Sequence, residues 1–294
     1  MRFALTGAAG FVAPRHMAVI KELGHDLVAA LDPHDSVGVL DTHAPDCRFF
    51  TSPEIFDRHL EKLRRAGEGI DYLSVCSPNW LHDAHARMGM RVDANVICEK
   101  PLVISPWNLD QLALLEAEYE RRVYCILQLR HHPSVAGLKR ALAPNHSHIR
   151  HQVQLTYVTR RGRWYDQSWK GDSAKSGGLA MNLGVHFFDA LLWIFGRCEE
   201  VHVDEESDRR MSGVLEMDRA TVRWTLSVDA ADLPTGAKGH AHRLLDIGGQ
   251  RVDFSHGFED LHRKAYEEIL AGRGFGIEDA RPAIEIVQQI RAQT

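Results

Sequence analysis

The chain has 294 residues, enough for two domains, and its 44% hydrophobic and 26% charged residues are typical of a soluble globular protein. The formal net charge of −5 argues against a general nucleic-acid binder, and no apolar run approaches the ~20 residues that a membrane span needs. The five cysteines form no Cys-x-x-Cys pair, which favours a reducing, cytoplasmic setting without disulfides.

Short apolar runs alternate with helical patterns through the first half of the chain. They predict strands over residues 3–6, 27–31, 72–76, 95–98 and 123–129, and helices from the first turn to about 23 and over 56–65, 81–90 and 107–121. Strands that are apolar throughout and are separated by helices indicate a parallel sheet that is covered on both faces. We therefore predict an α/β domain over residues 1–130.

Residues 131–294 follow a different pattern, and the change falls near 133–144. Two runs alternate polar and apolar residues, and four shorter runs are further candidate strands: 151–158 and 220–228, then 201–203, 213–217, 244–247 and 251–254. One-sided alternation predicts an open antiparallel sheet with one buried face. Two predicted helices, over 258–271 and 278–291, complete this α+β domain.

A turn of small residues joins the first strand to the first helix. A dinucleotide-binding G-x-G-x-x-G turn would place glycines at positions 7, 9 and 12, where this chain has Gly7, Ala9 and Val12, with Gly10 one place late. Small residues there let the backbone approach a pyrophosphate at a helix N-terminus. We expect Gly7, Ala9, Gly10, Phe11 and Val12 to bind a dinucleotide in a Rossmann domain; a plain strand-to-helix turn is the alternative.

An acidic residue ends the second predicted strand. Asp32 lies about 20 residues beyond the glycines, the distance expected for the carboxylate that binds the adenosine ribose. A carboxylate accepts hydrogen bonds from the ribose hydroxyls and repels a 2′-phosphate, so the sequence favours NAD over NADP. The alternative is a turn aspartate before Pro33.

Polar residues follow the next two predicted strands. Ser77 and Asn79 come after the third strand with His82 close behind, and Glu99 and Lys100 come directly after the fourth. Ligands of such sheets bind at the carboxyl ends of the strands, so we expect these side chains to flank the cofactor. Near a nicotinamide, Lys100 can polarise a reacting oxygen or help to take its proton. A surface lysine before a turn proline is the alternative.

A glycine-flanked apolar helix between residues 176 and 196 carries a polar stripe. Asn182, His186 and Asp189 are spaced i, i+4 and i+7, which puts them on one helix face. Such a stripe is costly unless its groups have partners. His186 is therefore either a core histidine held by Asp189 or a general base near the cofactor.

Basic and aromatic residues are interleaved over residues 160–175. Five basic side chains accompany only two aspartates in a chain that is acidic overall, and three large aromatics lie among them. Arginine and lysine beside aromatic rings suit an anionic ligand with flat or sugar-like parts, such as a nucleotide sugar. A solvated hairpin tip is the alternative.

Histidine is frequent, with 18 residues, and several lie close together in sequence, such as His82 with His85. None of the spacings matches a zinc signature such as H-E-x-x-H. We expect solvated or capping histidines and no metal site.

Taken together, the Gly7 turn, Asp32, Glu99-Lys100-Pro101 and 184–189 (Gly-Val-His-Phe-Phe-Asp) resemble the glucose-fructose oxidoreductase/inositol dehydrogenase/MocA family. The resemblance implies a Rossmann domain followed by an open antiparallel sheet. It also implies that Lys100 and His186 are the catalytic pair.

Several segments are more similar to one branch of that family, the UDP-N-acetylglucosaminuronate 3-dehydrogenases: 13–16, 76–85, 161–171, 175–178 and 276–282. This resemblance implies NAD-dependent oxidation of the sugar 3-hydroxyl, in the synthesis of a diacetamido uronic acid for lipopolysaccharide O-antigen. It implies a cytoplasmic homotetramer, a UDP-sugar substrate and, for cofactor recycling, a 2-oxo acid. The implied substrate-binding residues are Arg15, Arg161, Trp164, Tyr165, Ser168, Trp169, Lys170, Lys175 and Asn182.

One position departs from the broader family. Many of its members carry an aspartate four residues before the histidine, where this chain has Asn182, which cannot accept a proton. The division of roles between Lys100 and His186 is therefore open. The alternatives are a dehydrogenase of another sugar or cyclitol and a non-catalytic NAD-binding regulator, and the retention of both Lys100 and His186 argues against the second.

Overall fold

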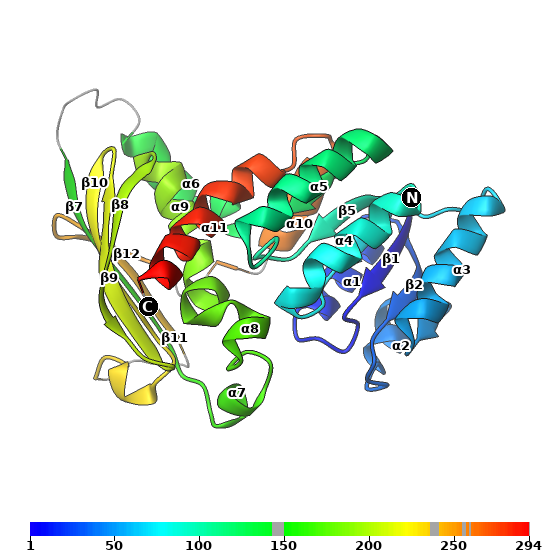
Figure 1. Cartoon of the computed structure of the whole chain (residues 1–294), viewed down its shortest axis with the longest axis horizontal. Coiled ribbons are helices and arrows are strands. Elements are labelled where there is room, and N and C mark those ends of the chain that lie inside the picture. The colour runs from blue at the N-terminus through cyan, green and yellow to red at the C-terminus, as the bar shows by residue number, and fades with distance from the viewer. Residues whose placement is uncertain (143–149, 236–240, 255–256, 259, 294) are drawn as a thin grey trace. The chain divides into compact units, whose positions relative to one another are not determined.

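The computed structural model describes residues 1–142, 150–235, 241–254, 257–258 and 260–293 (Figure 1). The chain forms two compact units. The first comprises Met1–Ile126 with His262–Ala280, and the second comprises Leu127–Leu261 with Arg281–Thr294. The first unit is therefore built from two segments that are far apart in the sequence.

The first unit is an α/β Rossmann fold. Its six strands pair in parallel in the order β3-β2-β1-β4-β5-β6. The strands are β1 (Arg2–Thr6), β2 (Asp26–Leu31), β3 (Arg48–Phe50), β4 (Tyr72–Val75), β5 (Asn95–Cys98) and β6 (Val123–Cys125). The helices between them are α1 (Ala13–Glu22), α2 (Val39–His43), α3 (Pro53–Arg65), α4 (His82–Arg91, after the 3₁₀ turn Asn79–Leu81) and α5 (Pro106–Tyr119).

The predicted parallel sheet is confirmed, and its central strands β4 and β5 are buried almost throughout, as expected for strands covered on both faces. Two short elements, α2 and β3, were not predicted. The strand expected over 123–129 ends at Cys125, and the chain continues into a 3₁₀ turn at Gln128–His131.

The second unit contains a six-stranded sheet in the order β12-β11-β7-β10-β9-β8. Its strands are β7 (His151–Thr159), β8 (Cys198–Glu206), β9 (Arg210–Met217), β10 (Ala220–Ser227), β11 (Ala241–Ile247) and β12 (Gln250–Asp253). Its helices are α6 (Pro133–Leu142), α7 (Trp164–Gln167), α8 (Ser173–Ser176), the π-helical turn Ala180–Gly184, α9 (Val185–Phe195), the 3₁₀ turn Ala230–Asp232 and most of α11 (Ile277–Ala292).

The expectation of an antiparallel sheet holds for most of these pairs but not for the centre. Strands β7 and β10 pair in parallel, because the chain leaves β7, passes through α7–α9 and the β8–β9 hairpin, and returns in the same direction. The other strand pairs are antiparallel, so the sheet is mixed.

Helix α9 forms the core of the second unit with this sheet. The Phe188 ring meets the Trp224 ring of β10 edge-on, with centroids 5.5 Å apart, and Phe187 lies against Tyr157 of β7. Within the described residues, one helical stretch, Ser173–Phe195, is long and apolar enough to cross a membrane by length and composition alone. Most of it is buried inside the protein, as is usual for a core helix.

Helix α10 (Leu261–Leu270) returns the chain to the first unit. Its Tyr266 is fully buried and its ring lies 6.1 Å from that of Phe3 in β1. Ala265 and Ile269 belong to the same buried cluster. The hydrophobic core of the Rossmann unit is therefore completed by a helix that follows the second sheet in the sequence.

Candidate active site

The turn after β1 has the shape that the sequence pattern predicts. Gly7 has φ +82°, and a Cβ there would lie 2.5 Å from the backbone of Cys76 and Ser77, so only glycine lets the ends of β1 and β4 approach so closely. The Gly10 N–H donates to the Gly7 carbonyl at 2.9 Å and closes the turn. Helix α1 then begins with no acidic residue in its first turn. A pyrophosphate fits this backbone and this helix N-terminus.

Phe11 in the turn and Arg15 in α1, both predicted site residues, face solvent. Phe11 is 88% exposed, and the guanidinium of Arg15 lies 5.7 Å from the centre of its ring.

Asp32 is buried at the end of β2 and holds the turn in place. The Ala9 N–H donates to Asp32 Oδ2, and the His34 N–H donates to Asp32 Oδ1, each at 2.9 Å. Each carboxylate oxygen keeps a second acceptor site, so the side chain can still accept hydrogen bonds from ribose hydroxyls. Asp32 therefore stabilises the turn, and its predicted contact with a ribose stays a prediction.

A pair of hydrogen-bonded side chains follows β4. Ser77 Oγ lies 2.8 Å from His85 Nδ1, and burial lowers the pKa of His85 to about 4, with a further contribution from nearby His82. Because His85 is neutral at pH 7, it can accept the Ser77 proton or donate one, depending on its tautomer. Asn79 is buried beside this pair in the 3₁₀ turn.

His82 connects the loops that follow β4 and β5. Its Nδ1 lies 2.6 Å from the Pro101 carbonyl, and its Nε2 lies 2.8 Å from the Ser77 carbonyl. Burial lowers the pKa of His82 below its usual value, although both carbonyls oppose that shift. The ring therefore holds together the two loops that carry the predicted cofactor residues.

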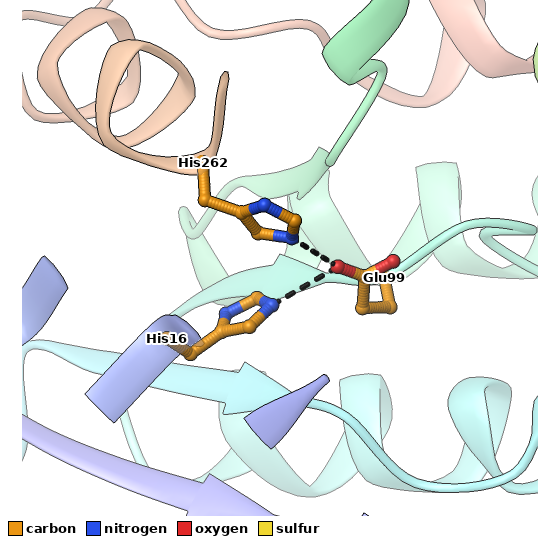
Figure 2. Close-up of side chains that lie close together, drawn as sticks. All are labelled: His16, Glu99 and His262. Atoms are coloured by element: carbon orange, nitrogen blue, oxygen red, sulfur yellow. Dashed lines mark hydrogen bonds and ion pairs between the residues drawn. The ribbon is translucent and has the colours of Figure 1, made fainter. Parts of the chain in front are cut away.

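The carboxylate of Glu99 is buried next to Lys100. Glu99 Oε2 accepts the Lys100 backbone N–H at 3.2 Å, and Glu99 Oε1 lies 3.0 Å from His16 Nε2 and 2.8 Å from His262 Nε2 (Figure 2). Lys100 itself precedes a cis peptide bond to Pro101. Of these residues, the sequence analysis singled out only Glu99 and Lys100.

In the second unit, local hydrogen bonds fold the basic aromatic segment around Tyr165. This ring is buried, and its hydroxyl accepts a hydrogen bond from Asn182 Nδ2 at 3.1 Å. Ser168 Oγ donates to the Tyr165 carbonyl at 2.9 Å and accepts the Lys170 N–H at 3.3 Å. Trp164, in contrast, is half exposed and meets the Tyr165 ring edge-on.

Arg161 and Lys170 are the partly buried cations of this segment, and neither has an acidic partner among the residues that the structure describes. The Nε of Arg161 is buried without a hydrogen-bond partner, and its guanidinium lies 5.9 Å from the centre of the Trp164 ring. The Lys170 ammonium lies 4.3 Å from the centre of the Trp169 ring, and burial together with the charge of Arg161 lowers the pKa of Lys170. Lys175, by contrast, forms an exposed ion pair with Asp172 at 3.2 Å.

His186 is half buried in the first turn of α9, and Asn182 lies on the π-helical turn before it. Asp189, one turn further, is buried in an ion pair with Arg130, in which Arg130 Nη2 donates to Asp189 Oδ1 at 2.7 Å. The π-helical turn is notable because such turns are frequent at functional sites.

Several residues that support these groups were not predicted from the sequence. His262 and Tyr266 lie more than 160 residues after Glu99, and no local pattern links them to it. Arg130 neutralises Asp189, and Arg209 donates to both Asp166 and the Arg161 carbonyl. No local sequence pattern marks any of these residues, so only the three-dimensional contacts reveal them as partners.

Comparisons with known proteins agree with this geometry. Residues 1–126 match a profile described as an oxidoreductase family with an NAD-binding Rossmann fold, and residues 150–235 match the C-terminal alpha/beta domain of the same family. The oxidoreductase subunit named for a UDP-kanosamine synthase of Amycolatopsis mediterranei is 26% identical over 258 residues, which cover 82% of this chain and 71% of that protein. Glucose-6-phosphate 3-dehydrogenase of Bacillus subtilis is 28% identical over 171 residues, which cover 54% of this chain and 46% of that protein.

A solved structure is similar over the whole chain. The WlbA (WbpB) dehydrogenase of Thermus thermophilus is 48% identical; its complex with NAD and alpha-ketoglutarate superposes with a TM-score of 0.97 over 100% of this chain and 96% of that one. Its complex with NAD and UDP-GlcNAcA superposes with a TM-score of 0.96 over 99% of this chain and 94% of that one. The chain therefore belongs to the glucose-fructose oxidoreductase/inositol dehydrogenase/MocA family of NAD-binding oxidoreductases.

Proposed function

We propose that this protein is an NAD-dependent dehydrogenase that oxidises the 3-hydroxyl of UDP-N-acetylglucosaminuronate to the 3-oxo sugar. The observation that carries the proposal is the likeness over nearly the whole chain to the Thermus dehydrogenase in complex with NAD and UDP-GlcNAcA. Oxidation at position 3 is supported by the Bacillus relative, which is named a 3-dehydrogenase of a different sugar.

The cofactor assignment rests on the loops after β1, β2, β4 and β5. The Gly7 turn would let a pyrophosphate approach the N-terminus of α1, which has no side-chain cap, and Asp32 offers an acceptor for ribose hydroxyls. The residues that we assign to NAD are Gly7, Ala9, Gly10, Phe11, Val12, Asp32, Ser77, Asn79, His82 and Glu99. When bound, NAD supplies the hydride acceptor.

The proton of the sugar hydroxyl falls to Lys100 and His186. Oxidation of an alcohol releases one proton as well as the hydride, so a positioned acid–base group lowers the barrier. Asn182 donates to Tyr165 and cannot itself take a proton, which excludes a simple aspartate–histidine relay at this position.

The two unpaired cations of the basic segment suit the anionic groups of the substrate. Arg161 has a buried Nε without a partner, and Lys170 is half buried beside it, so each would gain from a carboxylate or a phosphate. Lys175 is already in an ion pair. We therefore assign the uronate carboxylate to Arg161 or Lys170, with the other proposed substrate residues being Arg15, Trp164, Tyr165, Ser168, Trp169, Lys175 and Asn182.

Cofactor recycling by a 2-oxo acid extends the proposal. The Thermus dehydrogenase has been crystallised with NAD and alpha-ketoglutarate together. A 2-oxo acid that accepts the hydride from NADH would regenerate NAD and yield a 2-hydroxy acid, with one proton taken up. Loss of the enzyme-bound NADH signal on addition of 2-oxoglutarate would support this step.

The proposal extends to the cellular location, the pathway and the oligomeric state. All five cysteines are free and three of them are buried, which suits a reducing cytoplasm. A 3-oxo nucleotide sugar is a precursor for a diacetamido uronic acid of lipopolysaccharide O-antigen. We propose a homotetramer, and light scattering of the purified protein would test its mass.

The experiment that tests the reaction is identification of the product. Enzyme with NAD is mixed with UDP-N-acetylglucosaminuronate, the product is trapped with borodeuteride, and the position of the deuterium is read by NMR. Deuterium at C3 is the expected result. Deuterium at another ring carbon, or none with this substrate but some with another sugar, would replace the proposal with a different sugar dehydrogenase.

A further inference from the structure

A buried cluster of polar side chains contacts the backbone of Lys100. His16 comes from α1, Glu99 from the end of β5 and His262 from α10, and all three belong to the first unit (Figure 2). Both imidazoles direct Nε2 at the same carboxylate oxygen, Glu99 Oε1, at 3.0 and 2.8 Å. The other Glu99 oxygen accepts the backbone N–H of Lys100.

The protons of the cluster can be assigned from these contacts. Burial alone would raise the pKa of Glu99, but the hydrogen bonds from His16 and His262 outweigh it and hold the pKa well below its usual range. An ionised carboxylate only accepts, so both Nε2 atoms carry a proton. Burial lowers the pKa of His16, so this ring is neutral and its Nδ1 accepts the hydroxyl proton of Tyr266 at 2.8 Å.

The arrangement is that of a hydrogen-bonded anion rather than of a metal site. The three candidate ligand atoms lie within 4.8 Å of one another, which a divalent cation could in principle use. A cation, however, needs lone pairs that converge on a vacant point at about 2.0–2.2 Å from each ligand. Here the two Nε2 atoms converge on the carboxylate oxygen itself, at ordinary hydrogen-bond distances.

The cluster connects Lys100 to parts of the chain that the family profiles do not cover. Those profiles match residues 1–126 and 150–235, whereas His262 and Tyr266 lie on α10. Tyr266 continues the network to Ser74 Oγ on β4, at 2.8 Å. Four side chains from α1, β4 and α10 thus fix one carboxylate, whose other oxygen accepts the backbone N–H of the lysine proposed for catalysis.

We propose that the His16–Glu99–His262 cluster positions Lys100: the two imidazoles fix the Glu99 carboxylate, which in turn fixes the Lys100 backbone and so the reach of its ammonium. This inference rests on the proposed function, because it assigns a purpose to the loop of the proposed catalytic lysine. His16 and His262 are positioning residues. Glu99, which also belongs to the loop assigned to NAD, acts here by positioning Lys100, and none of the three is assigned a contact with the sugar.

The test is a double-mutant cycle between Glu99 and Lys100. Glu99→Gln keeps the size of the side chain, but its amide cannot accept from both imidazoles and from the Lys100 N–H. We expect Glu99→Gln to slow single-turnover NAD reduction by about 10- to 100-fold in the native background, as misplacement of a reacting group does. In the Lys100→Met background the same change should cost less than about threefold, because the group that it positions is gone.

Variants of His262 separate the hydrogen bond from simple packing. His262→Gln retains an N–H donor at the reach of Nε2, and we expect it to keep most of the rate. His262→Leu fills the space without a donor and should slow NAD reduction as Glu99→Gln does. Glu267→Gln, a change to an exposed carboxylate on the same helix, is the matched control and should leave the rate unchanged.

Three results would overturn the inference. Equal losses from Glu99→Gln in both backgrounds would show that the cluster acts independently of Lys100, and a His262→Gln enzyme as slow as His262→Leu would show that the donor is irrelevant. One equivalent of tightly bound zinc in the purified protein would make the cluster a metal site. A crystal structure of Glu99→Gln tests the positioning without any substrate, and we expect the Lys100 loop to be displaced in it. If the loop is displaced but the native enzyme does not oxidise the uronate, the proposed function is wrong and the positioning of Lys100 still holds.

Discussion

Individual residues at the ends of the Rossmann strands have two tasks, and Asp32 is the clearest example. Its carboxylate accepts the N–H groups of Ala9 and His34, so it shapes the turn that would approach the pyrophosphate. In the proposed cofactor site the same negative charge would favour NAD over NADP, because a 2′-phosphate would be brought close to a buried carboxylate.

We predict that NAD is used with higher kcat/KM than NADP. Like-charge repulsion between Asp32 and the 2′-phosphate is the physical reason. Steady-state kinetics with each cofactor at saturating sugar provide the measurement. Equal or better efficiency with NADP would remove Asp32 from the ribose site.

For the proposed proton-transfer pair, we predict that Lys100→Ala and His186→Ala each slow turnover by about 10²- to 10⁴-fold, the usual contribution of a general acid or base. Both variants should remain folded and should bind NAD normally, as judged by circular dichroism and by fluorescence titration. Near-native turnover in either variant would exclude that residue from the chemistry.

At the scale of elements, the helix that carries His186 is fixed by close packing. A Cβ on Gly184 would lie 2.7 Å from Phe188 and 2.8 Å from Leu226, so the π-helical turn before α9 sits tightly on β10. A Cβ on Gly137, in α6, would have no atom within 4 Å. These two glycines allow a matched comparison.

We predict that Gly184→Ala destabilises the protein by about 1–3 kcal/mol, as overpacking of a core does. Gly137→Ala should be neutral or stabilising by up to about 1 kcal/mol, because alanine favours a helix over glycine. Urea unfolding of the two variants and the native protein is the measurement. A Gly184→Ala protein as stable as the native one would contradict the tight packing of this turn.

The sequence predicts those elements whose pattern is local. The apolar strands β1, β2, β4 and β5 were located within one or two residues, because both of their faces are buried and their composition is distinct. The parallel pairing of β7 with β10 was not predicted, since alternation gives the buried face of a strand but not the direction of its neighbour. The return of α10 to the Rossmann unit leaves no local signal either.

The same limit explains what could be predicted of the site. Asp32, Glu99 and Lys100 follow strands directly, so the general rule for the carboxyl ends of parallel strands makes them candidates. His262 reaches Glu99 only through the tertiary packing of α10, and Arg130 reaches Asp189 in a similar way across 59 residues. Such partners depend on contacts that periodicity cannot encode.

At the scale of the whole molecule, buried neutral histidines make stability dependent on pH. Burial lowers the folded-state pKa of His85 to about 4 from an ordinary 6.5, and it lowers the pKa of His16 and His82 as well. Between these values the unfolded chain binds protons that the folded chain does not. Stability is therefore full above pH 6.5 and is lost as the pH falls toward 4.

We predict that His85 alone makes the native protein about 2 kcal/mol less stable at pH 5 than at pH 8, from ~1.4 kcal/mol per pKa unit. Over the same pH range, the stability of His85→Gln should fall by about 2 kcal/mol less than that of the native protein. Urea unfolding of both proteins at the two pH values checks this. The same pH dependence in both proteins would show that His85 titrates normally.

The central claim is that this enzyme recognises a uronate, and the two cations of the second unit give it a physical basis. Arg161 and Lys170 have no carboxylate partner in the described part of the chain, while the substrate carries a pyrophosphate and a carboxylate. A buried cation left without its anion costs about 1–3 kcal/mol, and a cost of about 2 kcal/mol is already more than tenfold in efficiency.

The most direct test is therefore NAD reduction with UDP-N-acetylglucosaminuronate and with UDP-N-acetylglucosamine, measured side by side under the same conditions. We predict that the uronate is oxidised with at least about tenfold higher kcat/KM, and that Arg161→Met or Lys170→Met reduces this ratio. Comparable efficiencies for the two nucleotide sugars would contradict the account and would point to a related dehydrogenase of a neutral sugar.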